Sequence, residues 1–138
     1  MPKIVFVNLP VSDVARSTAF YQALGFTKNE TFSNAQASAM TWSEGASVML
    51  LDRAFYATFT TKPIADTQAT SAALFALSFD SRAEVDTVTE AALAAGGREA
   101  HEAKDQGFMY SRAFEDPDGH GWGPFWMDPT AMPPAGDA

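Results

Sequence analysis

Apolar and polar residues follow one another along this chain in an order that occurs twice. Residues 4–11 form an apolar, β-branched run, and residues 73–79 form a second one. Each run is followed by short polar residues, then by apolar positions at helical spacing, then by glycine. Apolar β-branched runs predict strands, and apolar residues every three to four positions predict an amphipathic helix. The chain is therefore predicted to contain two copies of one strand–helix–strands unit.

The two predicted helices begin and end at residues with a clear physical role. Ser12 or Asp13 caps the first helix, because a short side-chain oxygen there accepts hydrogen bonds from free backbone N–H groups. Gly25 ends this helix, since glycine adopts the left-handed conformation at little cost. In the second unit, Ser81 and Glu84 have the spacing of a capping box. Both helices are thus delimited by their sequence.

The segments between and after the helices predict strands, turns and two irregular regions. Residues 116–119 read Asp-Pro-Asp-Gly, a strong turn signal. Residues 53–71 show no regular period and are too apolar for a plain tether, so we expect an extra contact or a lid over a pocket. Residues 129–138 are expected to form a loose C-terminal tail. Further strands are predicted at residues 36–42, 47–52, 98–102, 108–115 and 122–127.

Composition and charge restrict the classes of function. The length of 138 residues indicates one domain, and the absence of cysteine excludes disulfides and thiolate chemistry. No apolar run is long enough to cross a membrane and no leader pattern is present, so a cytoplasmic protein without a membrane partner is expected. With a net charge of −8 and only 9 Lys and Arg, nucleic acid is not an expected partner. The acidic balance is typical of a well-solvated protein surface, and it would also favour a cationic ligand.

Four segments together resemble the vicinal oxygen chelate superfamily, which includes glyoxalase I, bleomycin-binding proteins, fosfomycin-resistance transferases and extradiol dioxygenases. The resemblance covers residues 3 to about 128 and implies an α+β fold. In that fold two βαβββ modules, here about 3–60 and 72–128, form a U-shaped sheet around a cavity. It also implies a homodimer. The segments that carry it are Leu9-Pro10-Val11-Ser12-Asp13, Phe20 to Phe26, Ala91 to Gly97 and Phe114 to His120.

The resemblance also implies where a metal would be held, and those positions lack donor atoms. The four family ligand positions fall on Phe6, Leu50, Leu74 and Gly123, and none of these side chains offers the N, O or S atom that a divalent cation requires. No metal site and no cofactor are therefore expected, and the chain is disfavoured as an enzyme. No catalytic residue is predicted. A metal site would need unusual ligands, namely His101, His120 or Glu115, although a solvated loop position is expected for His120.

Strand periodicity predicts which side chains share the face of these four positions. Asn8 is the main polar candidate there, and its amide is expected to bond either a ligand or a neighbouring backbone. Trp42 is expected to pack structurally, with an aromatic wall of the cavity as the alternative, and Arg112 is expected on the opposite face, as a surface or interface residue. The candidate ligand-binding residues are Phe6, Asn8, Trp42, Val48, Leu50, Leu74, Ser111, Gly123 and Phe125, with Asp52, Ala76, Met109 and Ala113 on the same face.

Three hypotheses follow from these patterns. The first is a metal-independent protein that binds or sequesters a small molecule, with a cationic or aromatic ligand. The second is a metal-dependent lyase, transferase or dioxygenase of the same superfamily with atypical ligands. The third is a purely structural or subunit-contact role, in which Phe6 and Leu74 fill the cavity.

Overall fold

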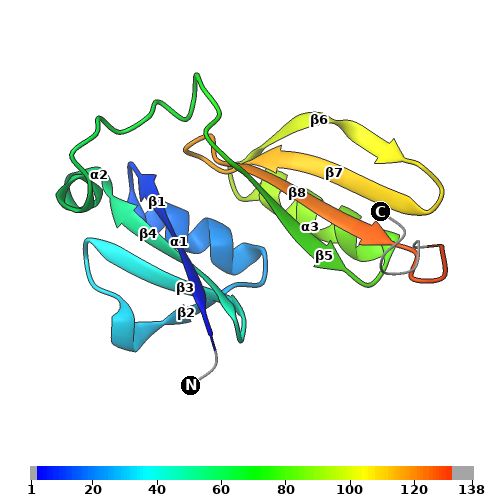
Figure 1. Ribbon diagram of the computed structural model, residues 1–138, viewed down its shortest axis with the longest axis horizontal. Helices are drawn as coiled ribbons and strands as arrows, with labels where there is room; N and C mark the ends of the chain where they lie inside the picture. Colours follow the sequence, from blue (N-terminus) through cyan, green and yellow to red (C-terminus); the bar gives the residue numbers. More distant parts are fainter. Residues whose placement is uncertain (1–2, 132–138) are drawn as a thin grey trace. The chain divides into compact units, whose positions relative to one another are not determined.

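The computed structural model describes residues 3–131 of the chain. These residues divide into two compact units, 1–70 and 71–138, and each unit has its own sheet (Figure 1). We call the described parts module 1 (residues 3–70) and module 2 (residues 71–131). Most of the predicted C-terminal tail, residues 132–138, lies outside the described residues.

Module 1 contains a four-stranded sheet with one long helix against it (Figure 1). The strand order is β1-β4-β3-β2, in which β1 and β4 are parallel and the other pairs are antiparallel. The segment 53–71, predicted as a contact or lid, begins with two short helical turns, and the first packs against β1 and β4. The elements are β1 (Val5–Val11), α1 (Val14–Ala23), β2 (Thr27–Asn29), η1 (Glu30–Phe32), β3 (Ala37–Ser43), β4 (Ala46–Asp52), α2 (Arg53–Tyr56) and η2 (Ala57–Phe59).

Module 2 repeats the same topology. Its strand order is β5-β8-β7-β6, again with the first pair parallel and the others antiparallel. The elements are β5 (Leu74–Phe79), α3 (Arg82–Ala94), β6 (Arg98–Asp105), β7 (Met109–Glu115) and β8 (Gly121–Met127). The prediction of an α+β fold with two βαβββ modules is therefore confirmed.

The predicted helix ends are also confirmed. The Asp13 side chain accepts a hydrogen bond from the backbone N–H of Arg16 at 3.0 Å, and the hydroxyl of Ser81 accepts one from Glu84 N–H at 3.1 Å. Gly25, directly after the first helix, has φ 106°, in the left-handed region that favours glycine. Local hydrogen bonding and backbone freedom thus set these boundaries.

Each sheet has one face against its helix and one face turned away from it, which we call the open face. In module 1 the helix face is the core, where Val11, Met40 and Leu50 are almost fully buried together with Phe20 and Tyr21 of α1. The rings of Phe20 and Tyr21 meet edge to face, with centroids 5.1 Å apart. Burial of this apolar surface is the main stabilising contribution in the module.

One predicted face assignment is wrong. Val48, Leu50 and Asp52 were expected on the same face as Phe6 and Asn8, but β1 and β4 pair with Phe6 opposite Ser47 and Asn8 opposite Met49. Directly paired residues lie on the same face of a sheet, so Ser47, Met49 and Leu51 occupy the open face. Side chains alternate along a strand, and a shift of one residue therefore moves every side chain to the other face.

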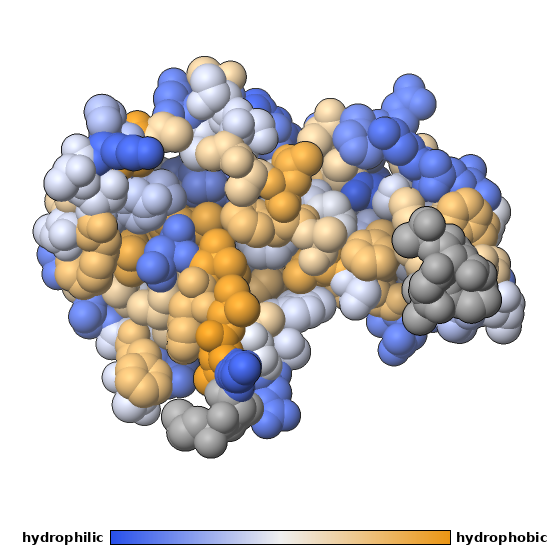
Figure 2. All heavy atoms as spheres, viewed as in Figure 1, coloured by the Kyte–Doolittle hydropathy of each residue, from blue (hydrophilic) through white to orange (hydrophobic). Residues whose placement is uncertain are grey.

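Large apolar side chains remain exposed on the edge strands. Val5 is 64%, Phe6 51% and Leu74 79% exposed. Figure 2 shows a strip of strongly apolar residues over β1. Within residues 3–131, no helix has the length and apolar character needed to span a membrane.

Candidate binding site

The open face of module 2 contains a hollow of about 480 Å³. Strands β5, β8 and β7 form its floor and β6 forms one side, and the segment that follows β6 completes its wall. The floor is apolar and the side is polar. The lining residues are Leu74, Phe75, Ala76, Ala100, His101, Lys104, Gln106, Met109, Ser111, Arg112, Ala113, Phe114, Glu115, Gly121, Trp122 and Gly123.

Small residues at the centre of the sheet make this space. Gly123 lies beside Ala76 in the parallel pair β5–β8, and a Cβ atom added at Gly123 would meet nothing closer than the Arg112 carbonyl oxygen at 3.8 Å. Gly121 differs, since a Cβ there would lie 2.8 Å from a methyl carbon of Leu74. The Leu74 side chain thus covers Gly121, while the position above Gly123 stays open.

The structure brings together part of the predicted site. Leu74, Ser111 and Gly123 line the hollow, as do Ala76, Met109 and Ala113. Phe125 pairs with Ser78 and Ser111 and so lies on the same face, beyond the lining residues. The predictions of a shared face in module 2 are confirmed, because the strand pairing follows the expected alternation.

The residues predicted from module 1 are divided between the two faces of their own sheet. Phe6 and Asn8 lie on the open face of module 1, whereas Val48 and Leu50 lie on its helix face. Trp42 also lies at the helix, because its ring packs against that of Phe26 with centroids 4.9 Å apart. Trp42 therefore packs beside the end of α1, which is the structural role that was expected as the alternative to an aromatic wall.

Residues of β6 on the polar side of the hollow were not predicted as ligand-binding. Lys104 lies opposite Ser111, and His101 lies opposite Ala113, so both belong to the open face. For His101 the sequence had favoured a plain edge-strand position over that of a metal ligand. Every residue of β6 is exposed, and its sequence has no apolar alternation that could have identified this face.

The donor atoms needed for a metal ion are missing at the family positions in this structure as well. Leu74 and Gly123 lie in the hollow without a donor group, and the register places Met49, not Leu50, on the open face of β4. A thioether is a soft ligand that does not suit the metals of oxygen-rich sites. Among residues 3–131, no group of three or more His, Asp or Glu side chains could hold a metal ion.

Of the two alternative metal ligands outside β6, His120 is buried and Glu115 is paired with an arginine. His120 was expected in a solvated loop, but its exposed fraction is only 6%. It follows a buried turn in which Asp116 Oδ1 accepts hydrogen bonds from the backbone N–H groups of Asp118 and His120, each at 2.9 Å. Glu115 accepts hydrogen bonds from Arg98, with Nη2 and Oε1 2.6 Å apart. The turn is confirmed and the solvated position of His120 is wrong, because the carboxylate of Asp116 organises a buried loop.

The helix face of module 2 contains a charged cluster around Arg112. This guanidinium, only 12% exposed, lies 3.1 Å from Asp86, 2.9 Å from Glu90 and 2.9 Å from Glu99. Burial disfavours its charge, but the hydrogen bonds with the three carboxylates outweigh that effect and raise the pKa of Arg112. The side chain of Arg112 lies on the face opposite to the hollow, as predicted, but it is largely covered by α3 and β6 and is not a surface group.

Two aromatic residues extend this cluster. Tyr110 donates a hydrogen bond to Asp86 Oδ1 at 2.6 Å, and this bond, with a smaller effect of burial, raises the pKa of the phenol. The guanidinium of Arg82 lies over the rings of Tyr110 and Trp126, 5.6 Å and 5.0 Å from their centroids. Arg82 also pairs with Asp105 and thereby lowers the pKa of that carboxyl.

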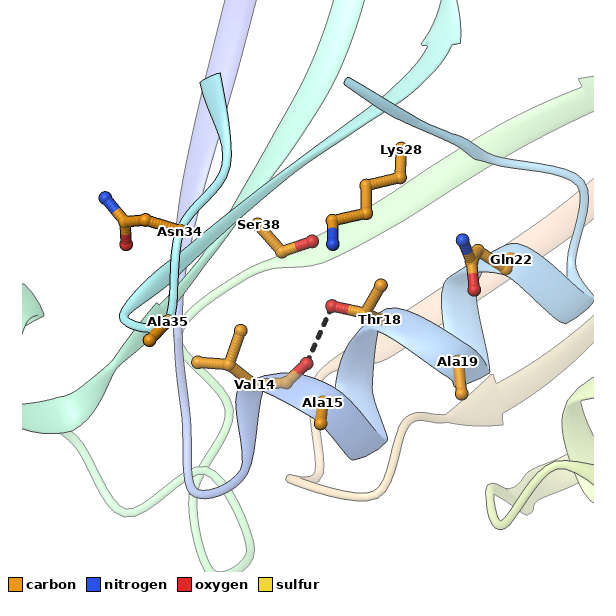
Figure 3. Close-up of a pocket in the computed structure, with 9 residues that line it drawn as sticks. All are labelled: Val14, Ala15, Thr18, Ala19, Gln22, Lys28, Asn34, Ala35 and Ser38. Carbon is orange, nitrogen blue, oxygen red and sulfur yellow. Dashed lines mark hydrogen bonds between the residues drawn. The ribbon is translucent and has the colours of Figure 1, made fainter. Parts of the chain in front are cut away.

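A smaller hollow, of about 290 Å³, lies on the helix face of module 1 (Figure 3). It is bounded by α1, by Lys28 of β2 and by residues 34–38. Figure 3 shows Thr18, Lys28 and Ser38 directed into the same space. The hydroxyl of Thr18 donates to the Val14 carbonyl at 2.7 Å, and Lys28 pairs with Glu30 at 3.5 Å. These polar groups have local partners, so the larger hollow of module 2 is the better candidate site.

Comparison with known proteins agrees with this architecture. A hypothetical protein from S. aureus superimposes with a TM-score of 0.77 at 23% identity, covering 91% of this chain and 94% of that one. A glyoxalase/bleomycin resistance protein/dioxygenase family enzyme from Burkholderia phytofirmans PsJN gives a TM-score of 0.75 at 18% identity, covering 91% and 99%. A lactoylglutathione lyase from Agrobacterium tumefaciens gives 0.65 at 18% identity, covering 96% and 98%. At these identities the likeness concerns the fold alone.

The sequence itself defines the family. Residues 3–123 match the Glyoxalase/Bleomycin resistance protein/Dioxygenase superfamily, and the chain belongs to this superfamily. None of the curated proteins matches the chain in sequence. The family is thus established, and the function within it has to be argued from the site.

Proposed function

We propose that this chain is a metal-independent protein that binds or sequesters a small molecule in the hollow of module 2. The observation that carries this proposal is the hollow itself, about 480 Å³ over an apolar floor. Small-molecule sites are commonly concavities of roughly 300–1,000 Å³ with mostly apolar walls and a few polar groups. The volume and lining of this hollow fit that description.

The alternative in which Leu74 fills the cavity receives less support. Leu74 covers only the position of Gly121, and the space above Gly123 remains. Filling a site completely requires side chains at its centre, and this centre is made of glycine and alanine. The hollow therefore favours binding over a purely structural role.

The metal-dependent alternative also receives less support. It would rely on His101 and Glu115, the potential donors that line the hollow. The Glu115 carboxylate is engaged by Arg98, and breaking this pair would oppose metal binding. Metal content after incubation with zinc, nickel, manganese and ferrous ions tests this point. Stoichiometric, tightly held metal would overturn the metal-independent proposal.

Self-association as a homodimer is part of the proposal. It is supported by the exposed apolar side chains of the two edge strands, Val5, Phe6 and Leu74, because exposed apolar patches on folded proteins often mark association surfaces. Light scattering coupled to size exclusion measures the mass directly. A monomer at micromolar concentration would contradict this part.

A single substitution distinguishes a binding hollow from a surface depression. Gly123→Met places a flexible side chain in the hollow, and the contacts of the new Cβ, at 3.8 Å and 3.9 Å, are ordinary. We expect the variant to fold and to lose ligand-induced thermal shifts in a screen of drug-like fragments. Ser78→Met is the matched control, because Ser78 is exposed on the same open face outside the lining residues.

Three outcomes of this screen are informative. Thermal shifts in the wild-type protein and Ser78→Met that disappear in Gly123→Met support the proposal. Shifts that persist in Gly123→Met place binding elsewhere and overturn the assignment of the hollow. No shift in any form, across anionic, neutral and cationic fragments, overturns the binding function.

A further inference from the structure

The hollow of module 2 has a polar side that includes a basic residue, although the chain as a whole is acidic. The net charge of −8 predicts a cationic ligand, but charges farther away than about 8 Å are largely screened at physiological salt. The groups that line the hollow therefore decide which ligand charge is favoured. These groups come mainly from strand β6.

The basic side chains of β6 lie on the open face. The pairing of β6 with β7 places Arg98 opposite Glu115, His101 opposite Ala113 and Lys104 opposite Ser111. Two of the three acidic residues of β6, Glu99 and Asp105, lie opposite Phe114 and Tyr110 and so on the helix face. There they bind Arg112 and Arg82. The third, Glu102, lies in the irregular stretch between His101 and Lys104 and is not among the residues that line the hollow, whereas His101 and Lys104 are.

The arginines of module 2 are all engaged by carboxylates. Each arginine between residues 71 and 131 is paired: Arg82 with Asp105, Arg98 with Glu115, and Arg112 with three carboxylates. Lys104 differs, since its ammonium group makes no ion pair or side-chain hydrogen bond with any residue in the described part of the chain. Glu115, the carboxylate that lines the hollow, is the partner of Arg98. The hollow therefore has one uncompensated positive charge.

His101 adds a polar atom to the same side. Its Nδ1 lies 2.8 Å from the Glu102 carbonyl oxygen, and because a carbonyl accepts, Nδ1 is the protonated nitrogen. Nε2 is then the atom left to accept a proton or hydrogen bond from a ligand. The floor offers mainly alkyl and thioether groups, from Leu74, Ala76 and Met109, together with the hydroxyl of Ser111.

Resting on the proposed binding function, we propose that the ligand is a small organic monoanion with an apolar or aromatic body. Its carboxylate pairs with Lys104, its body lies over Ala76, Ala113 and Gly123, and His101 Nε2 bonds a second polar group. A carboxylate fits one ammonium in charge, whereas a cationic ligand would meet Lys104 as a like charge.

The experiment compares three probes of one shape and different charge: 2-naphthoate, 2-naphthylmethanol and 2-naphthylmethylammonium. Calorimetry on the full chain measures the affinity of each. We expect 2-naphthoate to bind about tenfold more tightly than the alcohol, which is the usual magnitude of one charge-assisted hydrogen bond. The ammonium probe is expected to bind more weakly than the alcohol.

Two lysine variants complete the test. Lys104→Met keeps the length of the side chain and removes its charge, so it should lower the affinity for 2-naphthoate about tenfold and leave the alcohol unchanged. Lys62→Met is the matched control, since Lys62 is an exposed lysine of module 1 and its removal changes the net charge equally. Circular dichroism verifies the fold of each variant.

The outcomes separate this inference from the function on which it rests. Tighter binding of 2-naphthoate that is lost only in Lys104→Met supports it. Equal or tighter binding of the alcohol or the ammonium probe, or an unchanged 2-naphthoate affinity in Lys104→Met, overturns the anion preference and leaves a binding hollow. Absence of binding by all three probes overturns both.

Discussion

The two modules of this protein share one topology but are packed in opposite ways. Module 2 is filled on its helix face, by Arg112 and its carboxylates, and hollow on its open face. Module 1 is hollow on its helix face, where Ser38 lies, and presents large side chains on its open face. The position of a cavity in this fold therefore depends on a few residues and not on the topology.

Equivalent positions show which residues make the difference on the open face. The N-cap residues Asp13 and Ser81 align the two modules. The strand pairings then place Met49 and Gly123 at corresponding sites, since Asn8 pairs with Met49 and Ala76 with Gly123. Module 1 has the side chain of Met49 at this position, whereas module 2 has Gly123, which has no side chain. The hollow of module 2 occupies the space that such a side chain would take.

On the helix face the larger side chains belong to module 2 and the smaller ones to module 1. Counted from the N-caps, Thr18 and Gln22 of α1 correspond to Asp86 and Glu90 of α3, and the strand registers make Ser38 the counterpart of Arg112. The counterparts Lys28 and Glu99 even differ in sign. A serine cannot reach the helix as an arginine does, and the smaller hollow of Figure 3 is the space that remains.

The largest loss of stability is expected for Arg112→Ser, which introduces into module 2 the residue type of its counterpart Ser38 in module 1. It leaves three carboxylates facing one another without their shared cation, so we expect a loss of about 2–3 kcal/mol in the free energy of unfolding. The carboxylates are partly exposed and can be hydrated, which limits the loss. Urea denaturation measures it. Arg98→Ser is the control, with a loss of about 0.5 kcal/mol expected at an exposed pair; equal losses would contradict the structural role of Arg112.

A smaller effect is expected for Met49→Gly, which makes the open face of module 1 resemble that of module 2. Glycine in a strand raises the entropic cost of folding, and the lost side chain removes packing, so the loss is about 1.5–2 kcal/mol. The reverse change, Gly123→Met, should alter stability by less than about 1 kcal/mol because space is present. Thermal and urea unfolding of both variants compare the two. A larger loss for Gly123→Met would show that the hollow is already filled.

The next largest loss of stability is expected for Tyr110→Phe. This substitution removes the hydrogen bond to Asp86 and should lower the free energy of unfolding by about 1 kcal/mol near neutral pH. The folded-state pKa of Tyr110 is raised above its ordinary value, first by this bond. A raised pKa stabilises the fold below the unfolded value of about 10, and this contribution is lost as the pH rises through the folded pKa. Urea denaturation at pH 7, 9 and 11 should therefore give a difference between the two proteins that shrinks only above pH of about 10. A constant difference would contradict the role of the phenol proton.

The smallest effect is expected for Thr18→Val in the hollow of module 1. Its hydroxyl bonds only the carbonyl one helical turn earlier (Figure 3), so the change should stay within about 0.5 kcal/mol. The counterpart Asp86→Val removes a partner from both Tyr110 and Arg112 and should cost about 1–2 kcal/mol. Urea denaturation of the pair measures the contrast between the modules directly. Equal effects would remove the distinction between the two helix faces.

The sequence predicted most of the fold because its signals are local. Asp13, Gly25 and Ser81 act through the hydrogen bonds and backbone angles of their own neighbours, and these positions are where the helices begin and end. The three-residue strand β2 had no such signal, since it is defined by its pairing with β3. Signals that depend on a distant partner cannot be seen in a single segment.

The site was predicted less completely for the same reason. The shared face of Leu74, Ser111 and Gly123 follows from alternation along their strands, whereas Leu50 was placed on the wrong face because the register between β1 and β4 is a tertiary property. Lys104, which we propose as the group that binds the anion, was not predicted because it stands out only through the pairing of every arginine in module 2. That balance of charges is set by the folded module and not by composition.

The most direct measurement is chemical-shift mapping with 2-naphthoate. It tests whether the open face of module 2 binds a small molecule while the corresponding face of module 1 does not. In the ¹H–¹⁵N spectrum we expect shifts at Ala76, Ser111 and Gly123 that saturate, and no shifts around Asn8 and Met49. Saturating shifts confined to module 1, or the same shifts in Gly123→Met, would contradict the account.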